Sequence, residues 1–575
     1  MKAINILIGL SLIFSMGGVL GCRKSSDTSN LKTMRLALGD DTKTLDPATA
    51  YDSVSLDVVP LIYEGLYQYN YDKRPVEPEP LLAEGMPQIS DDKLTYTIKI
   101  KKGVLFHDSE VFASGKGREL KAEDVVYGWK RLAIPQLKSP GIWVYDGKIK
   151  GYSDFKKMLQ NNRENINDAI HSPIVGLNAV DDYTIKVQLT EPYPQLIHIM
   201  TMPFAAPVPK EAAEKWGQEG LIRKMVGTGP FYLKTMTEGS KIILAKNPHY
   251  HVKDLPKLDE ISYQIIKEPL PAWLMFLKGQ LDLSGIPKDS YDTAIQDDKH
   301  VSEELKNKGI SLLIQERPVS WYLNFNIKDS LLGKNADLRR AIVRTIDRDQ
   351  FIEKFLNGRG VKATSLIPTA IPGHVTRDHV PGDYNLAEAK KYLEKAGYPN
   401  GKGLPEIRYD LRGASTPSRQ QAEYFKNSLA QVGINIKIIP NSFPAYLEKE
   451  KNGNLQFFMG GWGADYPDAE NFLQLFYSKN VSPGPNASNY VNPEFDKLYE
   501  RIAKMEDSED RRALIKKAED LLFDEAICSM LFFPTAYILQ HQWVSNYKPN
   551  ELISNIMKYV DVDPKSRDTA LKKHF

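Results

Sequence analysis

Apolar residues recur at two different periods along the chain, and the two kinds of segment alternate. Runs in which every second residue is apolar predict strands, and apolar positions three or four residues apart predict helices. The expected strands lie at residues 34–38, 66–69, 94–100, 184–189, 231–233, 407–411 and 434–439. The expected helices lie at residues 53–63, 337–355, 386–396, 419–432 and 501–523, and another begins at Lys121. Strands and helices that alternate without a detectable repeat indicate the α/β class.

Two segments of this pattern predict more than the type of a single element. The helix at residues 419–432 lies between two expected strands, and such a β-α-β unit predicts a parallel sheet. An apolar run at residues 526–533 predicts a buried strand. We therefore interpret Cys528, within that run, as a core residue rather than a nucleophile.

The N-terminal segment differs from the rest of the chain. A basic start is followed by residues 3–20 without a charge, which is typical of an export signal. A stretch of about 18 apolar or small residues is also just long enough to span a bilayer. The stretch ends in Val-Leu-Gly-Cys, which resembles a bacterial lipobox, and this resemblance implies cleavage before Cys22 and lipidation of its thiol. We therefore expect an exported protein, periplasmic or on the cell surface, whose N-terminal lipid holds it at a membrane.

The amino-acid composition excludes several classes of protein. A chain of 575 residues predicts at least two domains. Hydrophobic residues make up 42% and charged residues 26%, which argues against a disordered or polytopic membrane protein. The 75 basic and 73 acidic residues leave a net charge of +2, which gives no reason to expect a nucleic-acid partner. With two cysteines, the fold is not a disulfide framework.

Motifs for catalysis, metal or phosphate are weak. His249 and His251 are expected on one side of a strand, but no cysteine or ordered carboxylates complete a metal site near them. Residues 227–230 (Gly-Thr-Gly-Pro) lack the Gly-Lys-Ser/Thr of a phosphate loop and lead into a strand. No motif nominates a carboxylate pair of the glycosidase type among the acidic residues. We therefore expect no metal, no cofactor and no enzymatic activity, with an exported hydrolase as a minor alternative.

The segment at residues 457–473 has an unusual composition. A run of strand-forming residues leads into glycines, then Trp462, then Asp465 among small residues. Glycine in a strand allows another backbone to approach closely. A tryptophan supplies a flat apolar wall, and the aspartate supplies a fixed negative charge. Together these residues are suited to an extended chain that begins with an ammonium group.

This segment is similar to one in the family 5 solute-binding proteins of ABC importers, particularly the oligopeptide-binding lipoproteins. The likeness covers nearly the whole mature chain, with an insertion at about residues 110–118. Further blocks similar to the family follow in order at residues 45–47, 63–66, 102–108, 121–125, 207–210, 226–230, 247–250, 338–341, 346–348 and 396–399. The resemblance implies a monomeric receptor with a bilobal periplasmic-binding-protein fold, which closes on a peptide and delivers it to ABC permease subunits.

The resemblance also implies a domain organisation. Two crossover strands, expected near residues 321–326 and 527–534, would join the lobes, and the buried strand predicted at residues 526–533 falls at the second of these places. The implied division is a signal peptide at residues 1–21, a tether at 22–31, lobe I at 32–66 and 206–325, an extra subdomain of lobe I at 67–205, lobe II at 326–529 and a return to lobe I at 530–575.

The resemblance assigns roles to particular residues. Asp465 would pair with the ligand's α-ammonium, although it could instead cap the helical turn that follows. Backbone groups of Gly461, Trp462 and Gly463 would bind the peptide as an added strand. Three further positions would face the cleft, with core packing as the equal alternative; these are Tyr322, Asn324 and Phe443.

Two positions depart from the family pattern, and they leave open which residue binds the C-terminal end of the ligand. Met459 stands where some oligopeptide binders have an arginine for the C-terminal carboxylate, and Gly463 replaces a cysteine. Arg412, Arg359 and Arg419 are possible substitutes for that arginine. Relatives that bind nickel complexes, haem, glutathione or oligosaccharides provide the alternative ligands.

Overall fold

The computed structural model describes residues 30–574, except 297–298 and 414. The predicted signal peptide and Cys22 lie outside these residues, as does all but the end of the predicted tether. Within the described part, no helix has the length and apolar character needed to cross a membrane.

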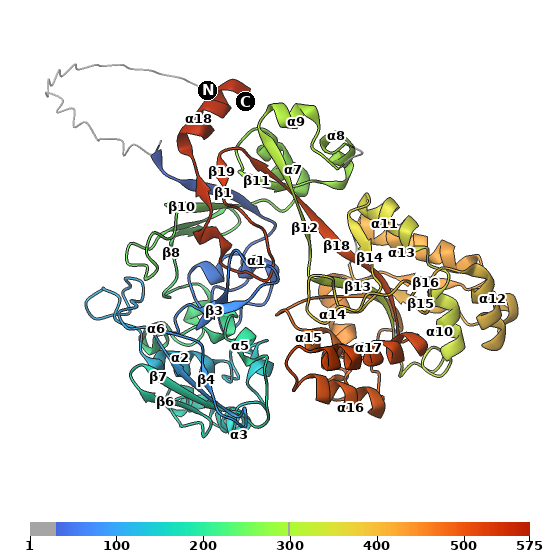
Figure 1. Cartoon of the computed structure of the whole chain (residues 1–575), viewed down its shortest axis with the longest axis horizontal. Coiled ribbons are helices and arrows are strands. Elements are labelled where there is room, and N and C mark those ends of the chain that lie inside the picture. The colour runs from blue at the N-terminus through green and yellow to red at the C-terminus, as the bar shows by residue number, and fades with distance from the viewer. Residues whose placement is uncertain (1–29, 297–298, 414, 575) are drawn as a thin grey trace, which may run out of the picture.

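The chain folds into two lobes that lie side by side and are joined by long strands (Figure 1). We call the lobe that holds both ends of the described chain lobe I, and the other lobe II. The strand β18 (Cys528–His541) belongs to both. Its first half pairs with β13 (Val319–Phe325) and β14 (Gly360–Lys362), and its second half pairs with β11 (Leu283–Gly285) and β12 (Ile310–Glu316). The predicted crossovers therefore correspond to β13 and β18.

Lobe I contains two four-stranded sheets. The first has the order β1 (Thr33–Leu38), β10 (Glu260–Ile265), β9 (Lys241–Lys246) and β8 (Phe231–Thr237). The second has the order β4 (Gln88–Ile89), β5 (Thr95–Lys99), β7 (Thr184–Gln188) and β6 (Leu177–Asp181), and we call the part built on it the extra subdomain. A small ribbon pairs β2 (Tyr67–Tyr69) with β3 (Pro78–Pro80).

Short helices lie around these sheets and beside β11 and β12. They are α1 (Ser53–Leu56), α2 (Ala122–Arg131), α3 (Tyr152–Asn161), α4 (Ile166–Ala169), α5 (Leu196–Ile199), α6 (Lys210–Trp216), α7 (Pro269–Leu277), α8 (Tyr291–Ala294) and α9 (Glu303–Asn307). The C-terminal elements β19 (Val544–Ser545), β20 (Asp561–Val562) and α18 (Pro564–His574) return to lobe I. Trp543 and Val560 bury their side chains in the same apolar core as β1 and α2, so the return segment is part of that core.

Lobe II is built on the other half of the large sheet. β13 pairs with β17 (Phe457–Gly463), which is followed by β15 (Ile407–Asp410) and β16 (Ile436–Ile439). β15 and β16 are parallel and are connected by α13 (Thr416–Ala430), so the β-α-β prediction is confirmed. The remaining helices are α10 (Ala336–Val343), α11 (Arg348–Leu356), α12 (Leu386–Lys395), α14 (Phe443–Lys451), α15 (Glu470–Leu473), α16 (Pro493–Ile502) and α17 (Glu509–Asp524).

Two long helices expected from periodicity are each divided in the structure. The prediction at residues 337–355 corresponds to α10 and α11, because Asp347 caps α11 and accepts a hydrogen bond from the amide of Gln350. The prediction at residues 501–523 spans the end of α16 and all but the last residue of α17, whose cap is Ser508. The apolar period continues across both breaks, so the capping residues were the only local signal.

Two shorter predictions were also inaccurate. Residues 53–63 form α1 and a separate 3-10 turn at Val59–Leu61, which contains Pro60. The strand expected around His249 and His251 is wrong, because His249 lies in a turn and His251 in a bend. His251 contacts the buried carboxylate of Glu64, with 2.9 Å between Nε2 and Oε2.

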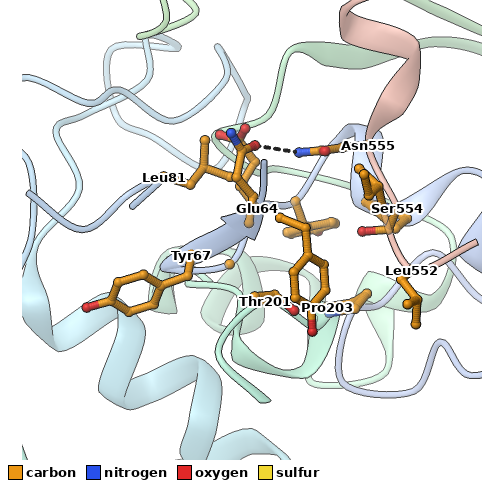
Figure 2. A pocket seen from close by; sticks show the side chains of 14 residues that line it. Glu64, Tyr67, Leu81, Thr201, Pro203, Leu552, Ser554 and Asn555 are labelled. Atoms are coloured by element: carbon orange, nitrogen blue, oxygen red, sulfur yellow. Dashed lines mark hydrogen bonds between the residues drawn. The ribbon is translucent and has the colours of Figure 1, made fainter. Parts of the chain in front are cut away.

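The return segment closes over a small cavity inside lobe I (Figure 2). Asn555 donates a hydrogen bond of 3.4 Å to Gln68 at one side of it, and Pro203 and Leu552 line another. The cavity has about 20 Å³, which is room for a single water molecule. It is therefore too small to hold a solute.

A buried ion pair explains one of the sequence blocks in lobe I. Asp46, in the Leu-Asp-Pro block, accepts two hydrogen bonds of 2.8 Å from Arg131 on α2, and both side chains are fully buried. The side-chain and backbone oxygens of Gln218 also accept from the guanidinium. The segment that holds Asp46 is thereby fixed to α2 of the extra subdomain.

We expect Asp46→Asn to destabilise lobe I by about 3–5 kcal/mol, because it leaves the Arg131 charge buried without a counter-charge. Urea unfolding followed by fluorescence measures the loss. As a matched control, Glu77→Gln breaks the exposed Lys73–Glu77 pair and should change stability by less than about 1 kcal/mol. Equal effects of the two substitutions would contradict this account.

Candidate ligand-binding site

The glycines of β17 make room for aromatic rings on the neighbouring strand. β17 runs antiparallel to β13, with Gly460 opposite Tyr322 and Gly461 opposite Trp321. A Cβ atom on Gly460 would lie 2.7 Å from the Tyr322 ring, and one on Gly461 would lie 2.6 Å from the Trp321 ring. Side chains at these positions would force the two strands apart, so ring packing within lobe II already requires the glycines.

One edge of β17 is available to another strand. β15 pairs with β17 only at Phe457 and Phe458, so the later residues are paired on the β13 side alone. The carbonyl of Gly461 accepts a hydrogen bond of 3.5 Å from the guanidinium of Arg412, which follows β15 on the side of β17 away from β13. Amide and carbonyl groups of one strand residue point to the same edge. The backbone of Gly461 is therefore positioned to pair with an extended ligand.

Asp465 follows this strand and is held by both lobes. Its Oδ1 accepts a hydrogen bond of 2.7 Å from the hydroxyl of Tyr51 in lobe I. Its Oδ2 accepts one of 3.0 Å from the amide of Asn471 on α15. The carbonyl oxygen of the same Asn471 side chain accepts from the indole of Trp462 and from the backbone amide of Asp465. Asn471 thus fixes Trp462 and Asp465 relative to each other.

The charge of Asp465 has no counter-charge in the described part of the chain, since no Lys, Arg or His there forms an ion pair with it. Burial raises the pKa of the Asp465 carboxyl, while the hydrogen bonds from Asn471 and Tyr51 act in the opposite direction. The helix-cap alternative is not supported, because the carboxylate that accepts from the first amide of α15 is that of Asp468. The carboxylate is therefore hydrogen-bonded by neutral groups and electrostatically uncompensated.

A cavity of about 510 Å³ lies between the lobes at this carboxylate. Tyr51 and Phe204 line it from lobe I, Ala464 and Asp465 from lobe II, and Arg317 from the connection between β12 and β13. This volume is typical of sites for small ligands. Closure of the lobes would enclose a molecule at Asp465.

The other predicted site residues have different surroundings. Tyr322 and Asn324 are 6% and 3% exposed; the tyrosine ring packs against Gly460 and Phe476, and the asparagine accepts from its neighbour's amide. Both positions match the core-packing alternative. Phe443, in contrast, is 46% exposed at the start of α14.

Phe443 lines a smaller cavity within lobe II, of about 270 Å³, together with Trp321, Arg412 and Met459. The Arg412 guanidinium lies 5.4 Å from the Trp321 ring centre and 5.6 Å from that of Phe443, and no described carboxylate forms an ion pair with it. Of the other two arginines considered, Arg359 binds backbone carbonyls near the interlobe strands, and Arg419 lines a different cavity beside α11. Of the three arginines considered as contacts for the ligand's C-terminus, Arg412 is thus the one that lies beside β17.

Sequence reasoning missed Tyr51 and Asn471. Asn471 lies within the unusual segment, but its contacts depend on the turn that folds α15 back towards Trp462. Tyr51 belongs to lobe I and lies 414 positions before Asp465 in the chain. No local pattern marks such a pair.

Comparisons with known proteins agree with this architecture. The family described as bacterial extracellular solute-binding proteins, family 5 Middle, matches residues 77–484. The oligopeptide-binding protein OppA of Bacillus subtilis is 28% identical, with 92% of this chain and 94% of that protein covered. The glutathione-binding protein GsiB of Salmonella choleraesuis is 26% identical, with 86% and 88% covered.

A solved structure gives the same result. The periplasmic binding protein DppA of Helicobacter pylori, in complex with the peptide STSA, aligns with a TM-score of 0.75 and 27% identity, covering 93% of this chain and 99% of that one. The predicted α/β bilobal fold is confirmed. Family 5 proteins are extracellular or periplasmic solute-binding proteins of ABC importers. Because the family match spans more than half of the chain, this protein belongs to family 5 of the bacterial extracellular solute-binding proteins.

Proposed function

We propose that the protein captures extended peptides with a free N-terminus between its two lobes and delivers them to an ABC permease. The observation that carries the proposal is the uncompensated carboxylate of Asp465 in the cavity between the lobes, beside a free strand edge. Catalysis is not needed for this role. The names of OppA and DppA, two of the proteins to which the chain is similar, support the same ligand class.

Each part of the site has a distinct task in this proposal. The ligand's α-ammonium replaces solvent at Asp465 and forms charge-assisted hydrogen bonds, which contribute about 1.5–3 kcal/mol each. The edge of β17 at Gly461 and Gly463 pairs with the peptide backbone, which gives affinity whatever the side chains are. Trp462 contributes through its indole bond to Asn471, which orients the carboxylate. Closure of the lobes buries the ligand and produces the form that a permease recognises.

Glutathione is the second candidate ligand. It carries its own α-ammonium, which Asp465 would bind in the same way, and GsiB is among the similar proteins. Nickel complexes, haem and oligosaccharides need no fixed anion at this position. Competition between glutathione and a tetrapeptide for the purified protein distinguishes the two candidates.

The proposal includes the location of the protein. In this proposal residues 1–21 act as an export signal, the thiol of Cys22 carries a lipid, and residues 22–31 tether a monomeric receptor to the outer side of a membrane. It also includes the domain limits expected from the sequence, with lobe II at residues 326–529 between the two crossover strands.

Asp465→Asn should weaken binding of a tetrapeptide by about 2–5 kcal/mol, or roughly 30-fold to several thousandfold, because it removes one partner of a buried charged pair. Isothermal titration calorimetry measures this loss. The N-acetylated form of the same peptide should bind wild-type protein as weakly as the free peptide binds the variant. If the acetylated and free peptides bind equally well, the role of Asp465 is refuted.

The raised pKa of Asp465 predicts a pH dependence with a defined sign. Only the ionised carboxylate attracts an ammonium group, so peptide affinity should fall on acidification from a higher pH than for an ordinary aspartate. In the free protein burial favours the neutral form, so this group's contribution to stability is present at low pH and is lost as the pH rises through its pKa. Asp465→Asn should therefore raise the melting temperature of the free protein at pH 7 while weakening peptide binding. A lower melting temperature would contradict this explanation.

In this proposal the guanidinium of Arg412 binds the C-terminal carboxylate of the peptide. Arg412→Met removes this charge-assisted contact, so it should reduce affinity for a peptide with a free C-terminus by roughly 10- to 150-fold. The same peptide with an amidated C-terminus should bind both proteins alike. Arg419→Met, on the same lobe but away from β17, is the matched control and should change neither affinity. An equal loss for free and amidated peptides would show that Arg412 acts only through packing on Trp321 and Phe443.

A further inference from the structure

A second cavity between the lobes lies on the side of the extra subdomain. It has about 580 Å³ and is lined by Trp143, Lys148 and Tyr193 from the extra subdomain and by Tyr477 and Tyr499 from lobe II. Among the elements of lobe II, α15 contributes Glu470 to its wall and α16 contributes Tyr499. The volume falls within the usual range for small-molecule sites. The cavity is therefore large enough to hold a solute.

This cavity is separate from the one at Asp465, and the two share no lining residue. Tyr466, which is 1% exposed, lies between them. Its ring is 6.4 Å from that of Trp143 and 6.1 Å from that of His198. A ligand in the second cavity would thus contact neither Asp465 nor the edge of β17.

The acidic groups around the second cavity already have partners. Glu191 pairs with Lys504 at 2.8 Å, and Glu500 pairs with Lys479 at 3.0 Å. Glu470 accepts hydrogen bonds from the hydroxyls of Tyr466 and Tyr499. Asp146 pairs with Lys156. Glu470 and Glu191 act on the nearby ammonium of Lys148 through space, but among the described residues no acid around the cavity forms an ion pair with it.

Unlike these acids, Lys148 has a neutral hydrogen-bond partner and two aromatic rings around its ammonium group. Its ammonium donates a hydrogen bond of 2.7 Å to the hydroxyl of Tyr193, and it lies 3.9 Å from the Tyr193 ring centre and 5.2 Å from that of Trp143. No carboxylate of the described residues forms an ion pair with it. Burial lowers the pKa of Lys148 to about 8, so the group is still charged at neutral pH. A partly desolvated cation at a cavity wall is stabilised by an anion that enters the cavity.

We propose that this second cavity binds a small organic carboxylate with a flat apolar body, whose anion pairs with Lys148 and whose body packs against the aromatic walls. Tyr477 and Tyr499, with ring centres 4.4 Å apart, form the wall contributed by lobe II. Because both lobes supply contacts, such a ligand binds the closed arrangement better than an open one, and so favours closure. The site is independent of the proposed peptide function and can fail or hold without it.

N-acetyl-L-phenylalanine and its amide are suitable probes, since they differ in the carboxylate and neither has an ammonium group for Asp465. Calorimetry on wild-type protein should show the acid binding at least about tenfold more tightly than the amide. Lys148→Met should remove this difference. Lys150→Met, an exposed lysine on the same segment, and Asp465→Asn should both leave it unchanged.

A second measurement uses only wild-type protein and does not depend on a folded variant. Acetic anhydride should label Lys148, as detected by peptide mass spectrometry, and the acid but not the amide should protect it. Failure of the acid to bind at millimolar concentration, or binding that survives Lys148→Met, would overturn the proposal. Loss of the acid–amide difference in Asp465→Asn would also overturn it, because the probe would then occupy the first cavity.

Discussion

The site depends on a half-buried carboxylate between two lobes that no cation of the described residues balances. Asp465 is oriented by the amide of Asn471 and by the hydroxyl of Tyr51, which are neutral donors. Neutral donors fix the position of the carboxylate but leave its charge available, whereas an arginine would have neutralised it. An ammonium-bearing ligand supplies the missing charge, so binding relieves an electrostatic cost that the empty protein carries.

The fold places this carboxylate through one continuous sheet. β18 contributes to both lobes, and β13 and β17 extend from it towards the cavity. β17 ends at Gly463, two residues before Asp465, so the strand edge and the charge lie together. The tyrosine that completes the carboxylate's contacts comes from lobe I. Relative movement of the lobes therefore changes the environment of Asp465 directly, which couples ligand binding to closure.

Sequence patterns predicted the features that depend on local order. The α/β class, the β-α-β unit around α13 and the buried strand that became the start of β18 follow from the apolar patterns, because each is encoded in consecutive residues. The crossover at β13 was placed by the family resemblance. The breaks before α11 and α17 did not follow from it, since one capping residue outweighs an apolar period that continues past it. The composition of residues 457–473 suggested Asp465 as an anion for an ammonium group, and the family resemblance assigned it that role.

The rest of the site depends on contacts between distant segments. Tyr51 reaches Asp465 from the other lobe, and Lys148 faces lobe II from the extra subdomain. Neither position has a distinctive neighbour in sequence. The glycines of β17 looked like space for a ligand, but the rings of Trp321 and Tyr322 already require them. Packing of this kind becomes visible only when the strand register is known.

The central claim is that the protein holds a ligand through its positive end, and native mass spectrometry of protein purified from the producing cells tests it most directly. Ligands that remain bound are released and fragmented, and their terminal amines are identified. The account predicts a mixture of peptides with unblocked N-termini. A bound solute without a primary amine would contradict it.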